Sequence, residues 1–216
     1  MGIKFVAFGL TGVLINLQGA DNPWDYIRKT YNIPNFWAQH LAGRISREEA
    51  KKEEYKAWKA ANVNISKLTT LFRNEPTLVN GVGTVVKALK EKKIISAIVS
   101  DSPSFVVSEI ATKIGAKYTA YNRVVFTREG YAYDTVPTHP TPDNRVDKLA
   151  AIREFSYRED AKMSETAFVT SNPEDLPTFK FVGLSVAFNT TDVNLKKSAH
   201  LALNSNSLAD ILDYLK

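Results

Sequence analysis

The sequence predicts an α/β fold built on a doubly wound, mostly parallel sheet, and two observations point to it. Apolar runs typical of buried strands alternate along the chain with amphipathic runs typical of helices. A long helical segment at 16–77 breaks this alternation after the first strand, which predicts an insertion. We therefore expect a core formed by residues 1–15 and 78–216, with a helical cap subdomain at 16–77.

The first strand and the insertion account for the N-terminal third of the chain. Residues 3–8 (IKFVAF) are apolar and end in the turn-prone GLTG, which predicts a buried strand followed by a loop. Aromatic and aliphatic residues then recur at helical spacing from about 22 to 75. Ser46 precedes Glu49 by three residues, the capping-box pattern of a helix start. All three tryptophans fall in this segment, and packing in a small helical bundle explains them better than a ligand-lining stripe.

The rest of the chain alternates between helices and strands. The expected helices are 82–93, 103–114 with Gly115 as its C-cap, 145–155 and 207–216. The expected strands are 94–100, the two arms of a hairpin at 121–127 and 131–136, and 167–171, 184–188 and 200–204. Ligands of such sheets bind at the carboxyl ends of the strands. The segments to examine are therefore 9–12, 100–102 and 170–175.

The composition limits the classes of partner. With 216 residues, 44% of them hydrophobic, the chain can bury one sizeable core. It has no cysteine and no run near the roughly 20 apolar residues of a membrane span, so we expect a cytoplasmic protein without membrane contact. The formal net charge is +5, but the lysines alternate with glutamates on predicted helices. This pattern favours solvated helix faces over a nucleic-acid surface.

Six segments carry a family resemblance in their order and spacing. They are KFVAFGLTGVL, GRISREEA, NGVGTVVKALKEKKIISAIVSDSPS, AYNRVVFTREGYAYD, AFVTSNPEDLPTFKFVGLSVAFN and AHLALNSNSLADILDYLK. Together they cover essentially the whole chain, which resembles the phosphoserine phosphatase branch of the haloacid dehalogenase (HAD) superfamily. The resemblance implies a HAD-like, Rossmann-like sheet with an inserted helical cap of the C1 type and a small β-hairpin.

The resemblance also implies a reaction. An aspartate at the end of the first strand attacks phosphorus, and a second, two residues on, acts as acid and base. A serine or threonine and a lysine neutralise the phosphoryl oxygens, while acids near the end of a later strand hold Mg²⁺. In this sequence Gly9 stands in place of the nucleophile and Thr11 in place of the acid/base. Ser171 replaces the leading metal-holding aspartate, and Glu174 replaces an asparagine.

Three elements of the family pattern remain. Ser100 matches the motif hydroxyl, Asp175 matches the second metal-holding acid, and Gly12 is kept in the first loop. Alignment of the later helix puts the family lysine near Pro142, leaving Lys148 nearly two turns away, so we expect the lysine to be lost. We expect no intact catalytic residue and no cofactor; Asp175 alone would bind Mg²⁺ poorly, and Mg²⁺ is expected only where family chemistry survives. The vestigial catalytic positions are Gly9, Thr11, Ser100, Ser171 and Asp175.

The first functional hypothesis is an inactive pseudophosphatase that binds a phosphorylated small molecule. Loss of the carboxylates removes repulsion of an anion, and backbone N–H groups and hydroxyls remain. Asp101 would repel an anion if it pointed inward, and Glu54 stands where a substrate-binding arginine would be expected. The candidate ligand-binding residues are Leu10, Thr11, Ser100, Asp101, Ser102 and Asn172. The simpler interpretation is that Ser100 and Ser171 only end their strands.

Two alternatives remain open. The chain could be an interaction or regulatory protein whose partner binds the scaffold, which an exposed apolar patch on the cap would favour. It could also be a weak phosphatase or other hydrolase with non-standard residues, for example His139 oriented by Asp101 or Glu174. A lone loop histidine is more often a surface residue, and the same interpretation applies to His40 and His200.

Overall fold

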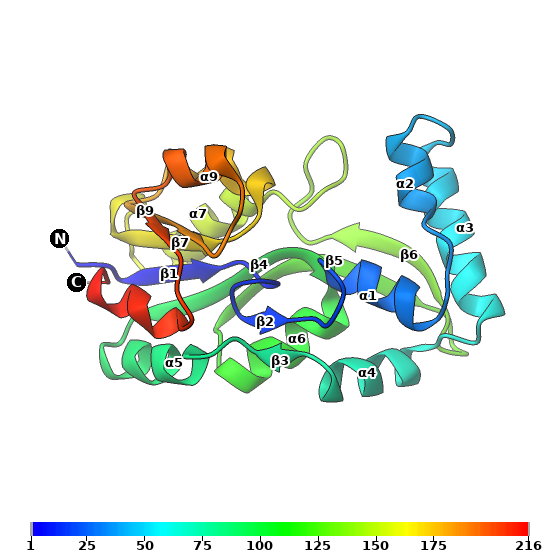
Figure 1. Cartoon of the computed structure of the whole chain (residues 1–216), viewed down its shortest axis with the longest axis horizontal. Coiled ribbons are helices and arrows are strands. Elements are labelled where there is room, and N and C mark those ends of the chain that lie inside the picture. The colour runs from blue at the N-terminus through cyan, green and yellow to red at the C-terminus, as the bar shows by residue number, and fades with distance from the viewer. Residues whose placement is uncertain (1, 216) are drawn as a thin grey trace.

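The computed structural model describes residues 2–215 and shows a seven-stranded sheet in the order β6-β5-β4-β1-β7-β8-β9 (Figure 1). The central strand β1 (Phe5–Phe8) pairs in parallel with β4 (Ile95–Pro103) and β7 (Thr166–Thr170). Beyond β7 lie β8 (Leu184–Phe188) and β9 (Leu201–Leu203), both parallel. The predicted fold class is confirmed.

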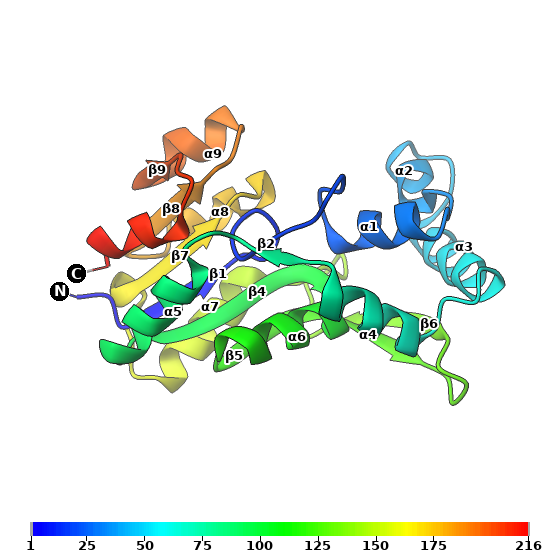
Figure 2. The same ribbon diagram turned by 60° about the horizontal axis from the view of Figure 1, so that its bottom comes forward.

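The predicted hairpin forms the other edge of the sheet. Its strands β5 (Tyr118–Phe126) and β6 (Ala132–Pro137) are antiparallel, and β5 joins the sheet by pairing in parallel with β4. Figure 2 shows the hairpin extending beyond the sheet toward the cap helices. The hairpin thus carries the core toward the inserted segment.

Helices cover both faces of the sheet because both faces are apolar. On one face lie α5 (Val82–Glu91), α6 (Ser104–Ile114) and the C-terminal 3₁₀ helix η3 (Leu208–Asp213); on the other lie α7 (Lys148–Arg158), α8 (Leu176–Phe179) and α9 (Val193–Ser198) (Figure 1). The short helices η1 (Met163–Glu165) and η2 (Pro173–Asp175) flank β7. Successive residues of β1 contribute to the two cores in turn, so the strand is apolar throughout, as a central parallel strand requires.

The inserted segment begins and ends in a two-stranded antiparallel ribbon, β2 (Ile15–Asn16) with β3 (Thr77–Leu78). Between these strands come α1 (Pro23–Thr30), α2 (Phe36–Leu41), α3 (Arg47–Ala60) and α4 (Ile65–Asn74). Each begins after an N-cap side chain that accepts a backbone N–H, and Ser46 does so for α3 as predicted. The boundaries at 16 and 77 as limits of a separate subdomain stay a prediction.

The four inserted helices pack largely against the core, which differs from the small bundle that the sequence predicts. α4 lies along α6 and α3 lies against β6, whereas α2 packs on α3 (Figure 2). The aromatic side chains explain this: Phe72 of α4 meets Phe105 of α6, and Trp58 of α3 is fully buried between Trp24 and Tyr55. Much of the aromatic content therefore serves packing.

The C-terminal segment differs from the helix predicted at 207–216. Its helix is of the 3₁₀ type, and Lys216 lies outside the described residues, as does Met1 of the predicted core segment. Gly115, by contrast, ends α6 in the left-handed conformation, as predicted. Within residues 2–215, no helix has the length and apolar character needed to cross a membrane.

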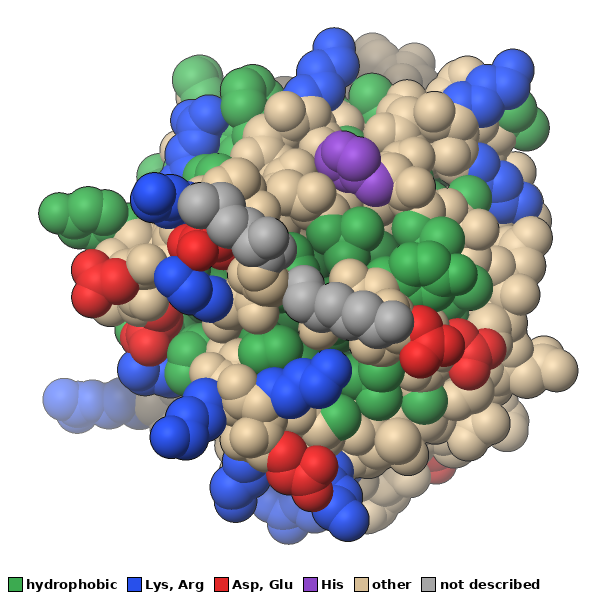
Figure 3. Space-filling view, turned by 90° about the vertical axis from the view of Figure 1, so that its left-hand side faces the viewer, with side chains coloured by type: hydrophobic (Ala, Val, Ile, Leu, Met, Phe, Trp, Pro, Cys, Tyr) green, Lys and Arg blue, Asp and Glu red, His purple; other side chains and the backbone are tan. Residues whose placement is uncertain are grey.

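The face that carries both chain termini shows basic side chains scattered among acidic and apolar ones (Figure 3). A single continuous basic surface does not form there, in keeping with the mixed Lys and Glu pattern of the sequence. The exclusion of nucleic acid as a partner stays a prediction.

Candidate functional site

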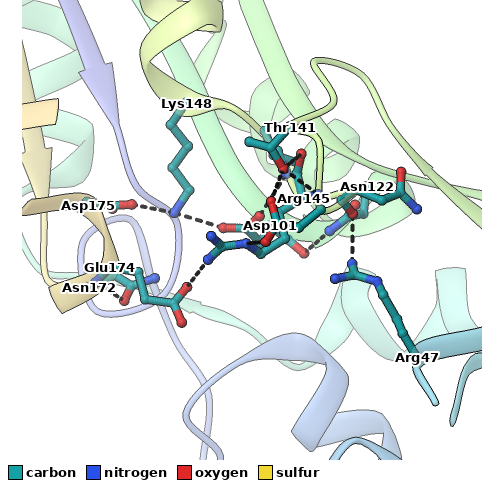
Figure 4. Close-up of polar contacts among 12 residues, drawn as sticks. Arg47, Asp101, Asn122, Thr141, Arg145, Lys148, Asn172, Glu174 and Asp175 are labelled. Atoms are coloured by element: carbon teal, nitrogen blue, oxygen red, sulfur yellow. Dashed lines mark hydrogen bonds and ion pairs between the residues drawn. The ribbon is translucent and has the colours of Figure 1, made fainter. Parts of the chain in front are cut away.

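Three strand ends bring the predicted site residues together. β4, β1 and β7 are neighbours and run in parallel, so the loops that follow them lie at one edge of the sheet. The loops after β1 and β7 carry Gly9 to Gly12 and Ser171 to Asp175, and Ser100 to Ser102 belong to the last residues of β4. The N-terminus of α7 reaches the same edge, which Figure 4 shows from close by.

The place beside Gly9 is taken by a threonine side chain. A Cβ at position 9 would lie 3.2 Å from Oγ1 of Thr170 and 3.6 Å from its Cα. That hydroxyl is held firmly, since it donates to Oδ2 of Asp175 at 2.6 Å and accepts the backbone N–H of Asn172 at 3.1 Å. A side chain at position 9 would therefore be crowded by Thr170 from its first atom.

The loop after Gly9 has an unpartnered hydroxyl and a tight turn. Oγ1 of Thr11 is buried and has no hydrogen-bond partner within residues 2–215. Gly12 has φ +77°, and a Cβ there would lie 2.7 Å from Oγ of Ser171. The Ser171 hydroxyl donates to the backbone carbonyl of Thr11 at 3.0 Å, which fixes the turn. The carbonyl of Leu10 accepts from three successive N–H groups, ending with that of Ile15.

The two serines near the C-terminal end of β4 bond to one another. Oγ of Ser100 donates to Oγ of Ser102 at 2.9 Å and accepts the Ser102 N–H at 3.1 Å, and both residues are buried. The side chain of Asn172 accepts the backbone N–H of Glu174 through Oδ1 and caps η2. Its role toward a ligand stays a prediction.

The expectation that the lysine is lost is wrong. Lys148 is the first residue of α7, and its Nζ lies 2.6 Å from Oδ1 of Asp175 and 3.0 Å from Oδ2 of Asp101 (Figure 4). Its side chain is only 9% exposed. Burial lowers the pKa of Lys148, but the charges of Asp175 and Asp101 and its hydrogen bonds to them outweigh burial, so the pKa is raised. The ammonium is therefore a fixed positive charge at the strand ends.

The carboxylate of Asp101 is paired, so it is not the free anion that would repel a ligand. Besides Lys148, its carboxylate accepts the backbone N–H of Val146 at 3.3 Å. Its backbone carbonyl accepts from Nε1 of Trp24 at 2.9 Å and from Nδ2 of Asn122 at 2.7 Å. Since Trp24 belongs to α1, this residue links the cap to the site.

A second cation lies at the mouth of the site. Arg145 is exposed; its Nε pairs with Asp143 at 2.6 Å, and its Nη1 lies 3.9 Å from Oε2 of Glu174 (Figure 4). Across from it, Arg47 of the cap donates to the backbone carbonyl of Asn144 at 2.7 Å. Neither arginine was predicted from the sequence; for Arg145, the position between turn formers and the start of α7 was the available signal.

The residues present do not fit Mg²⁺. Among residues 2–215, no group of three or more His, Cys, Asp or Glu side chains is placed to hold a metal ion. Asp175, the one metal-holding acid that the family pattern leaves, has both oxygens engaged, one by Lys148 and one by Thr170. A hard divalent cation needs several free oxygen ligands, and the described residues do not offer them at this edge of the sheet.

The histidines are occupied elsewhere. Nε2 of His139 pairs with Glu154 at 3.0 Å, and its ring packs edge-on against Phe155 of α7, so neither Asp101 nor Glu174 orients it. Nδ1 of His40 contacts the carbonyl of Ile45, and Nδ1 of His200 contacts Ser185. The structure thus gives no support to a histidine general base at the strand ends.

Glu54 is buried inside the cap, where it forms an ion pair with Arg28 at 3.4 Å and accepts from Nε1 of Trp58 at 3.2 Å. Burial raises the pKa of Glu54, and Arg28 and Trp58 counter it only in part. Nε of Arg28 and Oε2 of Glu54 have no partner within residues 2–215. The position where the family resemblance implies a substrate-binding arginine is therefore occupied by an acid that pairs with Arg28 inside the cap.

The comparisons with known proteins agree with the fold. No protein-family model matches the chain. Phosphoserine phosphatase of Methanocaldococcus jannaschii is 22% identical over 214 residues, which cover 99% of this chain and 98% of that protein. Among solved structures, a phosphoserine phosphatase in apo form has a TM-score of 0.80 at 21% identity and covers 99% of this chain and 100% of that one.

A HAD family hydrolase of Salmonella enterica subsp. enterica serovar Typhi has a TM-score of 0.78 at 15% identity, covering 98% of this chain and 70% of that one. The structural neighbours and the relative found by sequence are thus proteins of the same kind. The chain has the HAD fold, and along its whole length it is similar to the phosphoserine phosphatase branch of that superfamily.

Proposed function

We propose that this chain binds a phosphorylated small molecule at the carboxyl ends of β1, β4 and β7 and does not hydrolyse it. The observation that carries the binding is the buried Oγ1 of Thr11, which has no partner within residues 2–215. A buried polar group without a hydrogen bond costs about 1–3 kcal/mol, and a ligand oxygen or hydroxyl would recover that cost.

Two cationic side chains lie near the strand ends, and both are paired with acids of this chain. Lys148 stays charged at the strand ends, and Arg145 lies at the mouth of the site. Lys148 offsets one of the two negative charges of Asp101 and Asp175, so the pair repels an incoming anion less than two free carboxylates would. The loss of side-chain acids at Gly9 and Thr11 removes two further negative charges relative to the family pattern.

The absence of hydrolysis follows from the side chains at the end of β1. Glycine has no side-chain atom that could attack phosphorus, and the hydroxyl of Thr170 would crowd the Cβ of any other residue at position 9. The hydroxyl of Thr11 cannot transfer a proton near neutral pH as a carboxyl group does. Together these features favour a binding protein over a phosphatase.

The test is isothermal titration with O-phosphoserine, inorganic phosphate and a panel of phosphorylated sugars and nucleotides. Thr11→Val removes the unpartnered hydroxyl at nearly constant volume, and Ser100→Ala removes the motif hydroxyl. Thr112→Val, an exposed threonine on α6, is the matched control. We expect binding of at least one probe that Thr11→Val weakens by about tenfold, the equivalent of 1.4 kcal/mol, and that Thr112→Val leaves unchanged.

A flat panel would contradict the proposal and favour the alternative of a scaffold for a protein partner. Release of inorganic phosphate from a bound probe by the purified chain, lost in Ser100→Ala or Asp175→Asn, would contradict the absence of hydrolysis. That result would favour the weak-hydrolase alternative.

A further inference from the structure

All four carboxylate oxygens of Asp101 and Asp175 are bonded to groups of this chain. Oδ1 of Asp175 contacts Nζ of Lys148, and Oδ2 accepts the hydroxyl of Thr170. Oδ2 of Asp101 contacts the same Nζ, and Oδ1 accepts the N–H of Val146. The two acids therefore converge on one ammonium group and have no oxygen without a donor.

The position of Lys148 is not one that its helix favours. It is the first residue of α7, directly after the N-cap Asp147, and the N-terminus of a helix disfavours positive charge. Burial of an ammonium is costly as well. The side chain is held there by the two carboxylates, of which Asp175 is 3% exposed and Asp101 36% exposed.

We propose that the Lys148 ammonium takes the place of the divalent cation that the fold family implies, as a cation tethered to the chain. It neutralises one of the two negative charges and, together with Thr170 and the Val146 N–H, leaves no free carboxylate oxygen to ligate a metal ion. The wild-type chain accordingly binds no Mg²⁺ at this edge of the sheet. The inference concerns the two acids and the lysine only, so it holds or fails independently of phosphate binding.

Thermal denaturation in EDTA, in MgCl₂ and in CaCl₂ tests the proposal. NaCl is added so that the ionic strength is the same in all three solutions. We expect the midpoint of the wild-type chain to be the same in all three. Lys148→Met leaves the buried carboxylate of Asp175 and the partly exposed one of Asp101 without a cation, and its midpoint in EDTA should fall by about 5–15 °C. Mg²⁺ or Ca²⁺ should recover at least half of that loss, because the freed oxygens are hard ligands.

The controls separate this effect from general salt stabilisation. Lys180→Met removes an exposed lysine and should gain nothing from divalent cations. The double variant Lys148→Met/Asp175→Asn should lose the cation response, since one of the two acids is gone. Stabilisation of the wild-type chain by Mg²⁺ above the NaCl control overturns the proposal. So does a Lys148→Met variant that folds and whose midpoint does not change with divalent cations.

If the Lys148→Met variant does not fold in EDTA, it is refolded from urea in the presence of Ca²⁺. Recovery of the fold in Ca²⁺ then supports the proposal. If it folds in neither condition, Mn²⁺ titration of the wild-type chain followed by electron paramagnetic resonance decides. Bound Mn²⁺ that Asp175→Asn releases overturns the inference, and the absence of bound Mn²⁺ supports it.

Discussion

Gly9→Ala is expected to destabilise the fold, although it adds a single methyl group on a backbone that alanine can adopt. The new Cβ would lie 3.2 Å from Oγ1 of Thr170, closer than an ordinary contact. The hydroxyl cannot move away freely, because it is bonded to both Asp175 and Asn172. The site therefore resists the first atom of any side chain at position 9.

The magnitude follows from two opposed effects. Overpacking a filled site costs about 1–3 kcal/mol. Replacement of glycine by alanine restricts the unfolded chain and returns about 0.4–1 kcal/mol. The net loss in the free energy of unfolding for Gly9→Ala should be about 1–2 kcal/mol. The control Gly83→Ala lies in α5 with no atom within 4 Å of its new Cβ, and it should stabilise the protein.

A double-mutant cycle with Thr170→Ala, measured by urea denaturation, isolates the contact. Thr170→Ala alone should cost about 1–3 kcal/mol, because it leaves Oδ2 of Asp175 without its donor. In that background Gly9→Ala should become neutral or stabilising, which gives a coupling energy of about 1–3 kcal/mol. Additive effects within about 0.5 kcal/mol would show that Thr170 does not restrict position 9.

Three further outcomes are expected. Gly12→Ala should cost about 1–3 kcal/mol by urea denaturation, because φ is +77° and the new Cβ meets Oγ of Ser171; a stable variant would contradict the tight turn. Burial raises the pKa of Glu54 in the folded chain above its ordinary value of 4.5, so the wild type should lose stability relative to E54Q as pH rises from about 4.5 through that raised pKa. Urea denaturation of both chains across this pH range checks it, and a difference in midpoints that does not change with pH would refute it. His139→Ala should leave ligand binding unchanged in titration calorimetry, since His139 pairs with Glu154, and a tenfold loss would place it in the site.

The succession of strands and helices along the chain could be predicted because the apolar runs of the strands are separated by clear helical patterns. The place of Lys148 could not, because the alignment to the family pattern put the lysine near Pro142. The start of the helix was also set three residues too early. The predicted helix begins at Arg145, whereas α7 begins at Lys148 after the N-cap Asp147. The side chain of Asp147, which accepts the N–H of Ala150, was the signal for the true start.

The role of Thr170 lay beyond sequence reasoning for a different reason. The sequence shows that Gly9 lacks a side chain, but the neighbour that fills the space depends on the register of β1 against β7. Phe8 pairs with Val169 in that register, so the hydroxyl of the next residue on β7 lies beside Gly9. Pairings between strands far apart in sequence are set by the whole sheet and leave no local pattern.

The hydrogen bond from the Trp24 indole to the carbonyl of Asp101 has a practical consequence. All three tryptophans of the chain lie within residues 16–77, so fluorescence excited selectively in tryptophan comes from the inserted segment alone. One of these fluorophores is bonded to the residue that shares Lys148 with Asp175. The protein thus carries its own optical reporter, in which a change at the strand ends that shifts Asp101 alters the emission of Trp24 without any label.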